Sequence, residues 1–184
     1  MSYTKEEQQT LLALAHKAIE YKLETQKNFD VNPTQYPANL QAERATFVTL
    51  EKGTQLRGCI GSLEARQPLV TDVVCNAQAA AFSDPRFEPV GKDELAQLSI
   101  HISVLSEPQP LPCSSEQDLL DKLVPGKDGL ILEEGARRAT FLPSVWESLK
   151  DPRQFLAHLK QKALLPADYW SPNLRFYRYH TDYF

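Results

Sequence analysis

The chain has 184 residues, of which 42% are hydrophobic and 24% are charged, and its formal net charge is −4. This balance is ordinary for one globular domain and lacks the basic surface of a nucleic-acid-binding protein, so we expect no nucleic-acid partner. The sequence shows no apolar run of membrane-spanning length and no signal-peptide pattern, so we expect no membrane association. The three cysteines, Cys59, Cys75 and Cys113, are an odd number without metal-ligand spacing. They favour a reduced cytoplasmic setting and predict no metal site.

An amphipathic helix is predicted over residues 5–26. Thr4 and Glu7 have the spacing of a capping box at its start. Apolar side chains then recur at helical intervals from Leu11 to Leu23. The following asparagine- and proline-rich stretch is expected to be a loop that leads into the next element.

Residues 46–61 are predicted to form a β-hairpin. The first strand alternates and is rich in β-forming side chains, and Lys52 and Gly53 supply a turn from which the chain returns. Two glycines in the return strand, Gly58 and Gly61, weaken it. They therefore indicate a bulge, or a close approach by another backbone or a ligand.

The return strand is where residue types and spacing converge on chemistry. Side chains alternate across a strand, so Arg57 and Cys59 should share one face, with Leu56 and Ile60 on the other. A guanidinium two residues away, about 6.5 Å between Cα atoms, favours the thiolate form of Cys59. Arg57 could also clamp a carboxylate or phosphate, and we expect it to face a solvated cleft. Two structural alternatives stay open: Cys59 as a packing residue, and Arg57 as the partner of a carboxylate such as Asp84.

A second helix is predicted from residue 68 to residue 82, with Pro68 in its first turn. It is apolar almost all round, so it should be largely buried, with Cys75 as a small core residue. Its positive end begins a few residues after Cys59. If the connecting loop folds back, that end could bind an anion or assist a thiolate.

The segment Asp84-Pro85-Arg86-Phe87 ends this helix, because Pro85 disfavours helical geometry at the residue before it. Two roles stay open for Asp84 and Arg86. In one, Asp84 caps backbone groups in a turn while Arg86 pairs with a carboxylate. In the other, both side chains contact a ligand directly.

A strand over residues 98–104 has one core face and one polar face. His101 on the polar face is typical of a solvated histidine, and the four histidines show no metal-ligand spacing. The other predicted elements are a short helix opened by Ser115, a hairpin over residues 129–142, helices over residues 143–150 and 152–163, and a terminal strand over residues 174–184.

The run Leu56-Arg57-Gly58-Cys59-Ile60-Gly61, followed at this distance by Asp84-Pro85-Arg86-Phe87, resembles the signature of the AMMECR domain family. In prokaryotes this is the AmmeMemoRadiSam system protein A family. The resemblance covers about residues 5–184, with further matches at residues 102–106, 155–156 and 162–163.

The resemblance implies one domain over residues 1–184 with an α+β fold. Its sheet would be mainly antiparallel and built from hairpins, with helices packed against it. A larger lobe and a smaller C-terminal lobe would enclose a cleft lined by the LRGCIG segment. The chain departs from the family at three positions. It has His101 where family members often have an acidic residue, Lys160 where they often have cysteine, and Leu164 where they often have glycine. A cysteine at position 160 is therefore not available to pair with Cys59.

Two functions follow from these residues. In the first, the protein is an enzyme or enzyme component in which Cys59 is a nucleophile or redox thiol and Arg57 activates it or clamps a small anionic ligand. Gly58, Gly61, Asp84 and Arg86 are then candidate ligand-binding residues. In the second, it is a non-catalytic protein-interaction module and the LRGCIG segment is structural. The family's naming implies a pathway shared with Memo-like and radical-SAM proteins, and the sequence points to no particular cofactor.

Overall fold

The computed structural model describes residues 3–184, which form two compact units. Unit 1 contains residues 3–105 and 182–184, and unit 2 contains residues 106–181. Each unit has a four-stranded antiparallel sheet with helices beside it, so the predicted α+β fold is confirmed. The cleft between the lobes stays a prediction.

The sheet of unit 1 has the strand order β2-β1-β3-β8. Its strands are β1 (Thr46–Lys52), β2 (Gln55–Gly61), β3 (Leu98–Leu105) and β8 (Thr181–Tyr183). The predicted hairpin is confirmed, but its register shifts between Leu50 and Glu51, so that Arg57 has no cross-strand partner. Leu56 then pairs with Glu51 and is 41% exposed. It shares the sheet face of Thr49 and Cys59, which corrects its predicted position on the opposite face beside Ile60.

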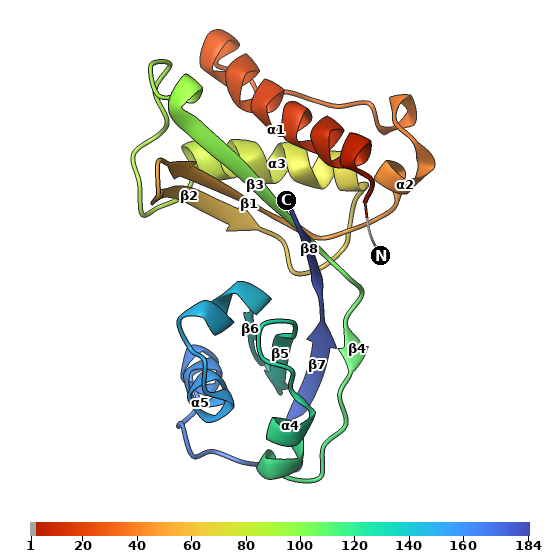
Figure 1. The fold of residues 1–184 in the computed structure, drawn as a ribbon, viewed down its shortest axis with the longest axis vertical. Helices are drawn as coiled ribbons and strands as arrows, with labels where there is room; N and C mark the ends of the chain where they lie inside the picture. Colours follow the sequence, from red (N-terminus) through yellow and green to blue (C-terminus); the bar gives the residue numbers. More distant parts are fainter. Residues whose placement is uncertain (1–2) are drawn as a thin grey trace. The chain divides into compact units, whose positions relative to one another are not determined.

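Two long helices cover one face of this sheet (Figure 1). The predicted capping box starts α1 (Lys5–Thr25), with both reciprocal bonds between Thr4 and Glu7. The buried helix α3 (Leu69–Phe82) packs on β1 and β2, and α1 packs on α3 and β3. Cys75 is exposed, not in the core as predicted. The shorter elements are η1 (Pro33–Gln35), α2 (Ala38–Gln41) and η2 (Leu95–Gln97).

A buried polar cluster joins α3 to the start of β1. The Asp72 carboxylate accepts hydrogen bonds from the backbone and hydroxyl of Thr46, from the Ser62 hydroxyl and from the Gln67 amide. Asn76 adds a further bond at 2.9 Å. Five donors compensate the desolvation of this buried carboxylate, so it fixes the chain after β2 to the first turns of α3.

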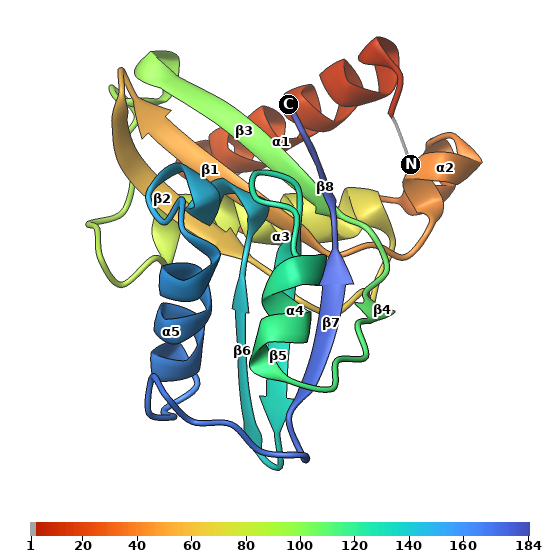
Figure 2. The same ribbon diagram turned by 60° about the horizontal axis from the view of Figure 1, so that its bottom comes forward.

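The sheet of unit 2 has the order β4-β7-β5-β6. Its strands are β4 (Gln109–Pro110), β7 (Arg175–Tyr179), β5 (Gly129–Glu134) and β6 (Arg137–Phe141), and its helices are α4 (Glu116–Lys122), η3 (Pro143–Glu147) and α5 (Pro152–Lys162). Figure 2 shows β6, β5 and β7 side by side, with α5 against β6. The predicted second hairpin is confirmed. The predicted terminal strand is interrupted at His180, where the chain passes from β7 in one sheet to β8 in the other.

Unit 2 has its own core, built around the stacked rings of Trp146 and Phe155. Lys160 is buried inside it, where its ammonium donates to Glu116 Oε2 at 2.6 Å and to Ala167 O at 3.2 Å. Two acceptors make this buried charge tolerable. None of the helices in residues 3–184 has the length and hydropathy needed to cross a membrane.

Candidate functional site around Cys59

Cys59 lies on the edge strand of unit 1, opposite Thr49. Both backbone polar groups of Cys59 point away from β1, so the two residues form a non-hydrogen-bonded pair, in which side chains approach most closely. Thr49 Oγ1 and Cys59 Sγ are 3.2 Å apart and share a hydrogen bond. The hydroxyl can therefore donate to the sulfur when the thiol loses its proton.

The Asp84-Pro85-Arg86 turn covers the open edge of β2 at Cys59. The Cys59 N–H donates to Asp84 Oδ2 at 2.9 Å, and Arg86 Nη2 donates to the Cys59 carbonyl at 3.2 Å. Arg86 also makes a two-point pair with the Asp84 carboxylate at 3.0 and 2.7 Å. The Arg86 guanidinium, with the backbone N–H groups of Cys59 and Arg86, holds the pKa of Asp84 well below its usual range. These two side chains thus take the place of a neighbouring strand, which is the capping role that the sequence left open.

Arg57 is held by a residue that the sequence did not suggest. Its Nε and Nη2 donate to the two carboxylate oxygens of Glu94, each at 3.0 Å. The Arg57 side chain is only 15% exposed, so the expectation of a solvated position is wrong. The hydrogen bonds from Arg57 and from the Gly91 N–H lower the pKa of Glu94 to about 2. Within residues 3–184, Arg57 Nη1 is buried and has no hydrogen-bond acceptor.

The two arginines near Cys59 lie over one aromatic ring. The guanidinium carbons of Arg57 and Arg86 are 6.0 and 5.5 Å from the centre of the Phe87 ring. These distances fit cation–π contacts, which hold both charges beside strand β2. The DPRF segment thus contributes three side chains to the surroundings of Cys59: Asp84, Arg86 and Phe87.

The two glycines of the strand are explained by close packing. A Cβ at position 58 would lie 2.2 Å from the Ala80 carbonyl oxygen, so β2 approaches the backbone of α3 directly. A Cβ at position 61 would lie 2.3 Å from the Phe47 ring and 2.5 Å from the Thr46 carbonyl. The predicted close approach is therefore confirmed at Gly58, and its partner is backbone. Ligand binding by Gly58 and Gly61 stays a prediction.

The end of α3 that lies near Cys59 is the C-terminal end, not the N-terminal end that the sequence analysis considered. Gly58 packs against Ala80 in the last turn of the helix, whereas the first turns lie near Thr46 and Ser62. Cys59 is therefore near the negative end of α3. Because that end disfavours an anion, the helix dipole gives a Cys59 thiolate no assistance.

His101 shares the sheet face of Cys59, because each is a cross-strand partner of Thr49. Its Nε2 lies 3.5 Å from Glu51 Oε2, and its ring stacks on Tyr183 with 5.3 Å between ring centres. Residues 3–184 contain no group of three or more His, Cys, Asp or Glu side chains arranged to hold a metal ion. Thr49 and Glu94 are the site residues that the sequence analysis missed.

Thr49 could have been found by counting across the hairpin, but the bulge, which the glycines indicated as one of two alternatives without placing it, changes that count by one residue. Glu94 has no local signal. Eleven residues of irregular chain, 83–93, separate it from α3, and nothing in the sequence distinguishes it from the other acidic residues of that segment. Only the tertiary path of that segment along β2 brings it to Arg57.

Comparisons with known proteins agree with this fold. The family model described as AMMECR1 matches residues 12–184. A protein of Methanothermobacter thermautotrophicus is 39% identical over 183 residues, which cover 98% of this chain and 95% of the relative. A protein of Methanopyrus kandleri is 38% identical over 98% of this chain and 89% of the relative.

A crystal structure of an uncharacterised protein from Pyrococcus horikoshii superimposes with a TM-score of 0.85 at 34% sequence identity, covering 95% of this chain and 88% of that one. The match extends through both units, and the LRGCIG and DPRF segments lie within the residues matched by the family model. The chain belongs to the AMMECR1 family.

Proposed function

We propose that this protein is an enzyme or enzyme component that holds a small anion beside Cys59. The Cys59 thiol is the nucleophile or redox group, and Arg57 donates to the anion. Gly58, Gly61, Asp84 and Arg86 shape the site around them. The protein acts in the cytoplasm, in a pathway with Memo-like and radical-SAM proteins, as the motif resemblance implies.

The observation that carries this proposal is the third nitrogen of Arg57. Glu94 occupies Nε and Nη2, while Nη1 is buried and finds no acceptor among the described residues. A buried N–H without an acceptor is costly, so a ligand oxygen placed there would gain a charge-assisted hydrogen bond. Because Glu94 already fixes the guanidinium, binding would cost little side-chain entropy.

A second candidate is the non-catalytic interaction module. The packing of the motif favours it, since Gly58 lies against the Ala80 carbonyl and the backbone of Cys59 is bound by Asp84 and Arg86. In that case the LRGCIG segment would only stiffen an edge strand. A partner protein would bind elsewhere on the surface, without any need for the thiol.

The test compares the wild-type protein with Cys59→Ser and Arg57→Lys variants in a protein-free metabolite extract. We expect the wild-type protein to convert a small anionic metabolite or to gain an adduct on the Cys59 peptide, both detected by mass spectrometry. Cys59→Ser should do neither. Arg57→Lys keeps the charge but loses the planar geometry, so the yield should fall at least about tenfold.

Cys113→Ser is the matched control, because it removes a thiol from unit 2 and should leave the yield unchanged. Unfolding midpoints of all variants show whether any loss reflects misfolding. The enzyme proposal fails if folded Cys59→Ser matches the wild-type protein in the extract. If that variant also keeps wild-type binding to a Memo-like or radical-SAM protein in a pull-down, the module is favoured.

A further inference from the structure

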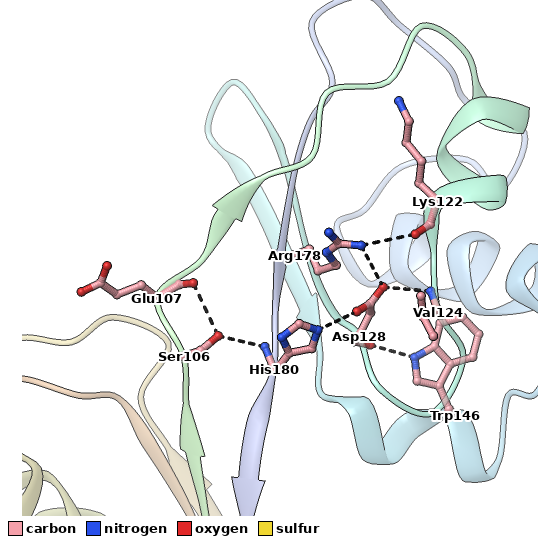
Figure 3. Close-up of polar contacts among 8 residues, drawn as sticks. All are labelled: Ser106, Glu107, Lys122, Val124, Asp128, Trp146, Arg178 and His180. Atoms are coloured by element: carbon pink, nitrogen blue, oxygen red, sulfur yellow. Dashed lines mark hydrogen bonds and ion pairs between the residues drawn. The ribbon is translucent and has the colours of Figure 1, made fainter. Parts of the chain in front are cut away.

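A second group of charged side chains belongs to unit 2 and gathers around the buried carboxylate of Asp128 (Figure 3). Asp128 Oδ1 is 3.0 Å from His180 Nε2, and Asp128 Oδ2 is 3.6 Å from Arg178 Nη1. Arg178 and His180 are separated by one position at the end of β7, so their side chains leave the strand on the same side. One carboxylate thus holds an imidazole and a guanidinium next to each other.

The rest of unit 2 fixes this carboxylate firmly. Oδ2 accepts the Val124 N–H at 2.8 Å, and the Asp128 carbonyl accepts the indole N–H of Trp146 at 2.7 Å. The side chain of Asp128 is 1% exposed. It therefore cannot reach solvent itself, and it contacts the two side chains in front of it.

The two residues in front keep unused hydrogen-bonding capacity. His180 and Arg178 side chains are 61% and 37% exposed. Among the described residues, the Arg178 guanidinium makes its hydrogen bond and its ion pair through Nη1, which donates to Lys122 O at 3.4 Å and faces Asp128. With Nε2 facing Asp128, His180 Nδ1 faces away from the carboxylate. Nδ1 of His180 and both Nε and Nη2 of Arg178 are thus available to a ligand.

We infer that Arg178 and His180 form a binding site for a small oxyanion, a phosphate or a carboxylate, with Asp128 as the positioning residue. A guanidinium and an imidazolium presented together match two oxygens of one anion. Their rotamers are already fixed by the buried carboxylate, so binding costs little side-chain entropy. A cation would be repelled by Arg178. This inference does not depend on the proposed role of Cys59.

The protonated ring of His180 is the form that can donate to an oxyanion. A neutral imidazole that donates Nε2–H to Asp128 offers only a lone pair at Nδ1, whereas the protonated ring offers a donor. The charged groups around it are Asp128 and Arg178, with Lys122 on α4 and Glu107 on the neighbouring segment. Lys122 is paired with Asp118, and the Glu107 side chain points away from the imidazole in Figure 3. An oxyanion should therefore bind to the form of His180 in which both ring nitrogens carry a hydrogen.

The test is a titration of the full-length protein with inorganic phosphate, followed by the NMR signals of the four histidine rings. His180→Gln assigns the His180 signal by its disappearance. We expect that signal to shift saturably with phosphate at about pH 6, while the signals of His16, His101 and His158 move little. Arg178→Gln should weaken the apparent affinity at least about tenfold. Acetate titrated in the same way distinguishes carboxylate from phosphate preference.

Arg175→Gln is the matched control, because it removes an exposed arginine from the same strand and should leave the affinity unchanged. Sodium chloride at equal ionic strength controls for screening. The site does not exist if the His180 signal stays fixed with both anions, or if chloride reproduces the shift. An unchanged affinity in folded Arg178→Gln would equally overturn it.

Discussion

Glu94 and Arg57 join strand β2 to the irregular chain after α3, and neither side chain is more than 20% exposed. That Arg57 needs a partner could be expected from its position in a strand, but the partner could not be named. The sequence suggested Asp84, whose nearest cation turned out to be its own neighbour in the turn, Arg86. Charged residues of a loop carry no periodicity, so residue-level pairs across the fold depend on tertiary structure.

The Glu94 pair should give the folded state a specific acid sensitivity. The pKa of Glu94 is lowered to about 2 by Arg57 and the Gly91 N–H, below the unfolded-chain value of about 4.3. The unfolded chain therefore binds the proton more tightly, so the stabilisation is complete above about pH 5 and is lost as the pH falls toward 2. Glu94→Gln should be less stable than the wild-type protein at neutral pH, with a difference that shrinks on acidification. Urea unfolding of both proteins at several pH values measures this, and a difference that grows toward acid would contradict it.

Elements with local signals were predictable from the sequence. The capping box of α1, the turn at Lys52 and Gly53, and the Asp151-Pro152 start of α5 each depend on a few neighbouring residues, and each formed as expected. The bulge in β2 was one of the alternatives that Gly58 and Gly61 indicated, but its exact position and the direction in which α3 passes Cys59 did not follow from such signals. Both are set by how the hairpin fits on the helix, because Gly58 must meet the carbonyl of Ala80.

That contact predicts a large cost for a very small substitution in β2. Gly58→Ala would place a Cβ 2.2 Å from the Ala80 carbonyl oxygen, which belongs to the backbone and cannot turn aside. We expect a loss of about 2 to 4 kcal/mol in the free energy of unfolding, measured by urea denaturation. Gly91→Ala is the control, because the atoms nearest to its Cβ would belong to the flexible side chains of Asp93 and Glu94 and not to the backbone. Equal stabilities of the two variants would show that β2 and α3 can separate at little cost.

At the scale of the whole molecule, the sequence did not reveal that unit 2 is an insertion. The predicted terminal strand, residues 174–184, is divided between the two sheets at His180. The alternation of side chains continues through His180, so the periodicity predicted one continuous strand. The partner of β8 is β3, which lies more than seventy residues earlier in the chain. Pairing at this sequence distance leaves no local signature.

The insertion can be tested by removing it. Ile102 and Phe184 exchange backbone hydrogen bonds, and the Ser106 N–H donates to the His180 carbonyl in the same antiparallel register. Residues 107–179 can therefore be replaced by an Asn-Gly turn, which closes such a hydrogen-bonded pair as a tight hairpin. We expect the shortened chain to fold, because the core of unit 1 contains no residue from unit 2.

Circular dichroism of α1 and α3 during urea unfolding measures the outcome, since both tryptophans, Trp146 and Trp170, leave with the insertion. In the complementary fragment, residues 106–181, the same tryptophans should report a cooperative transition, because they belong to the separate core of unit 2. Phe155→Ala in that fragment removes the ring stacked on Trp146 and should abolish the transition. A shortened chain without cooperative unfolding would mean that unit 1 depends on unit 2 for its fold, despite a core of its own.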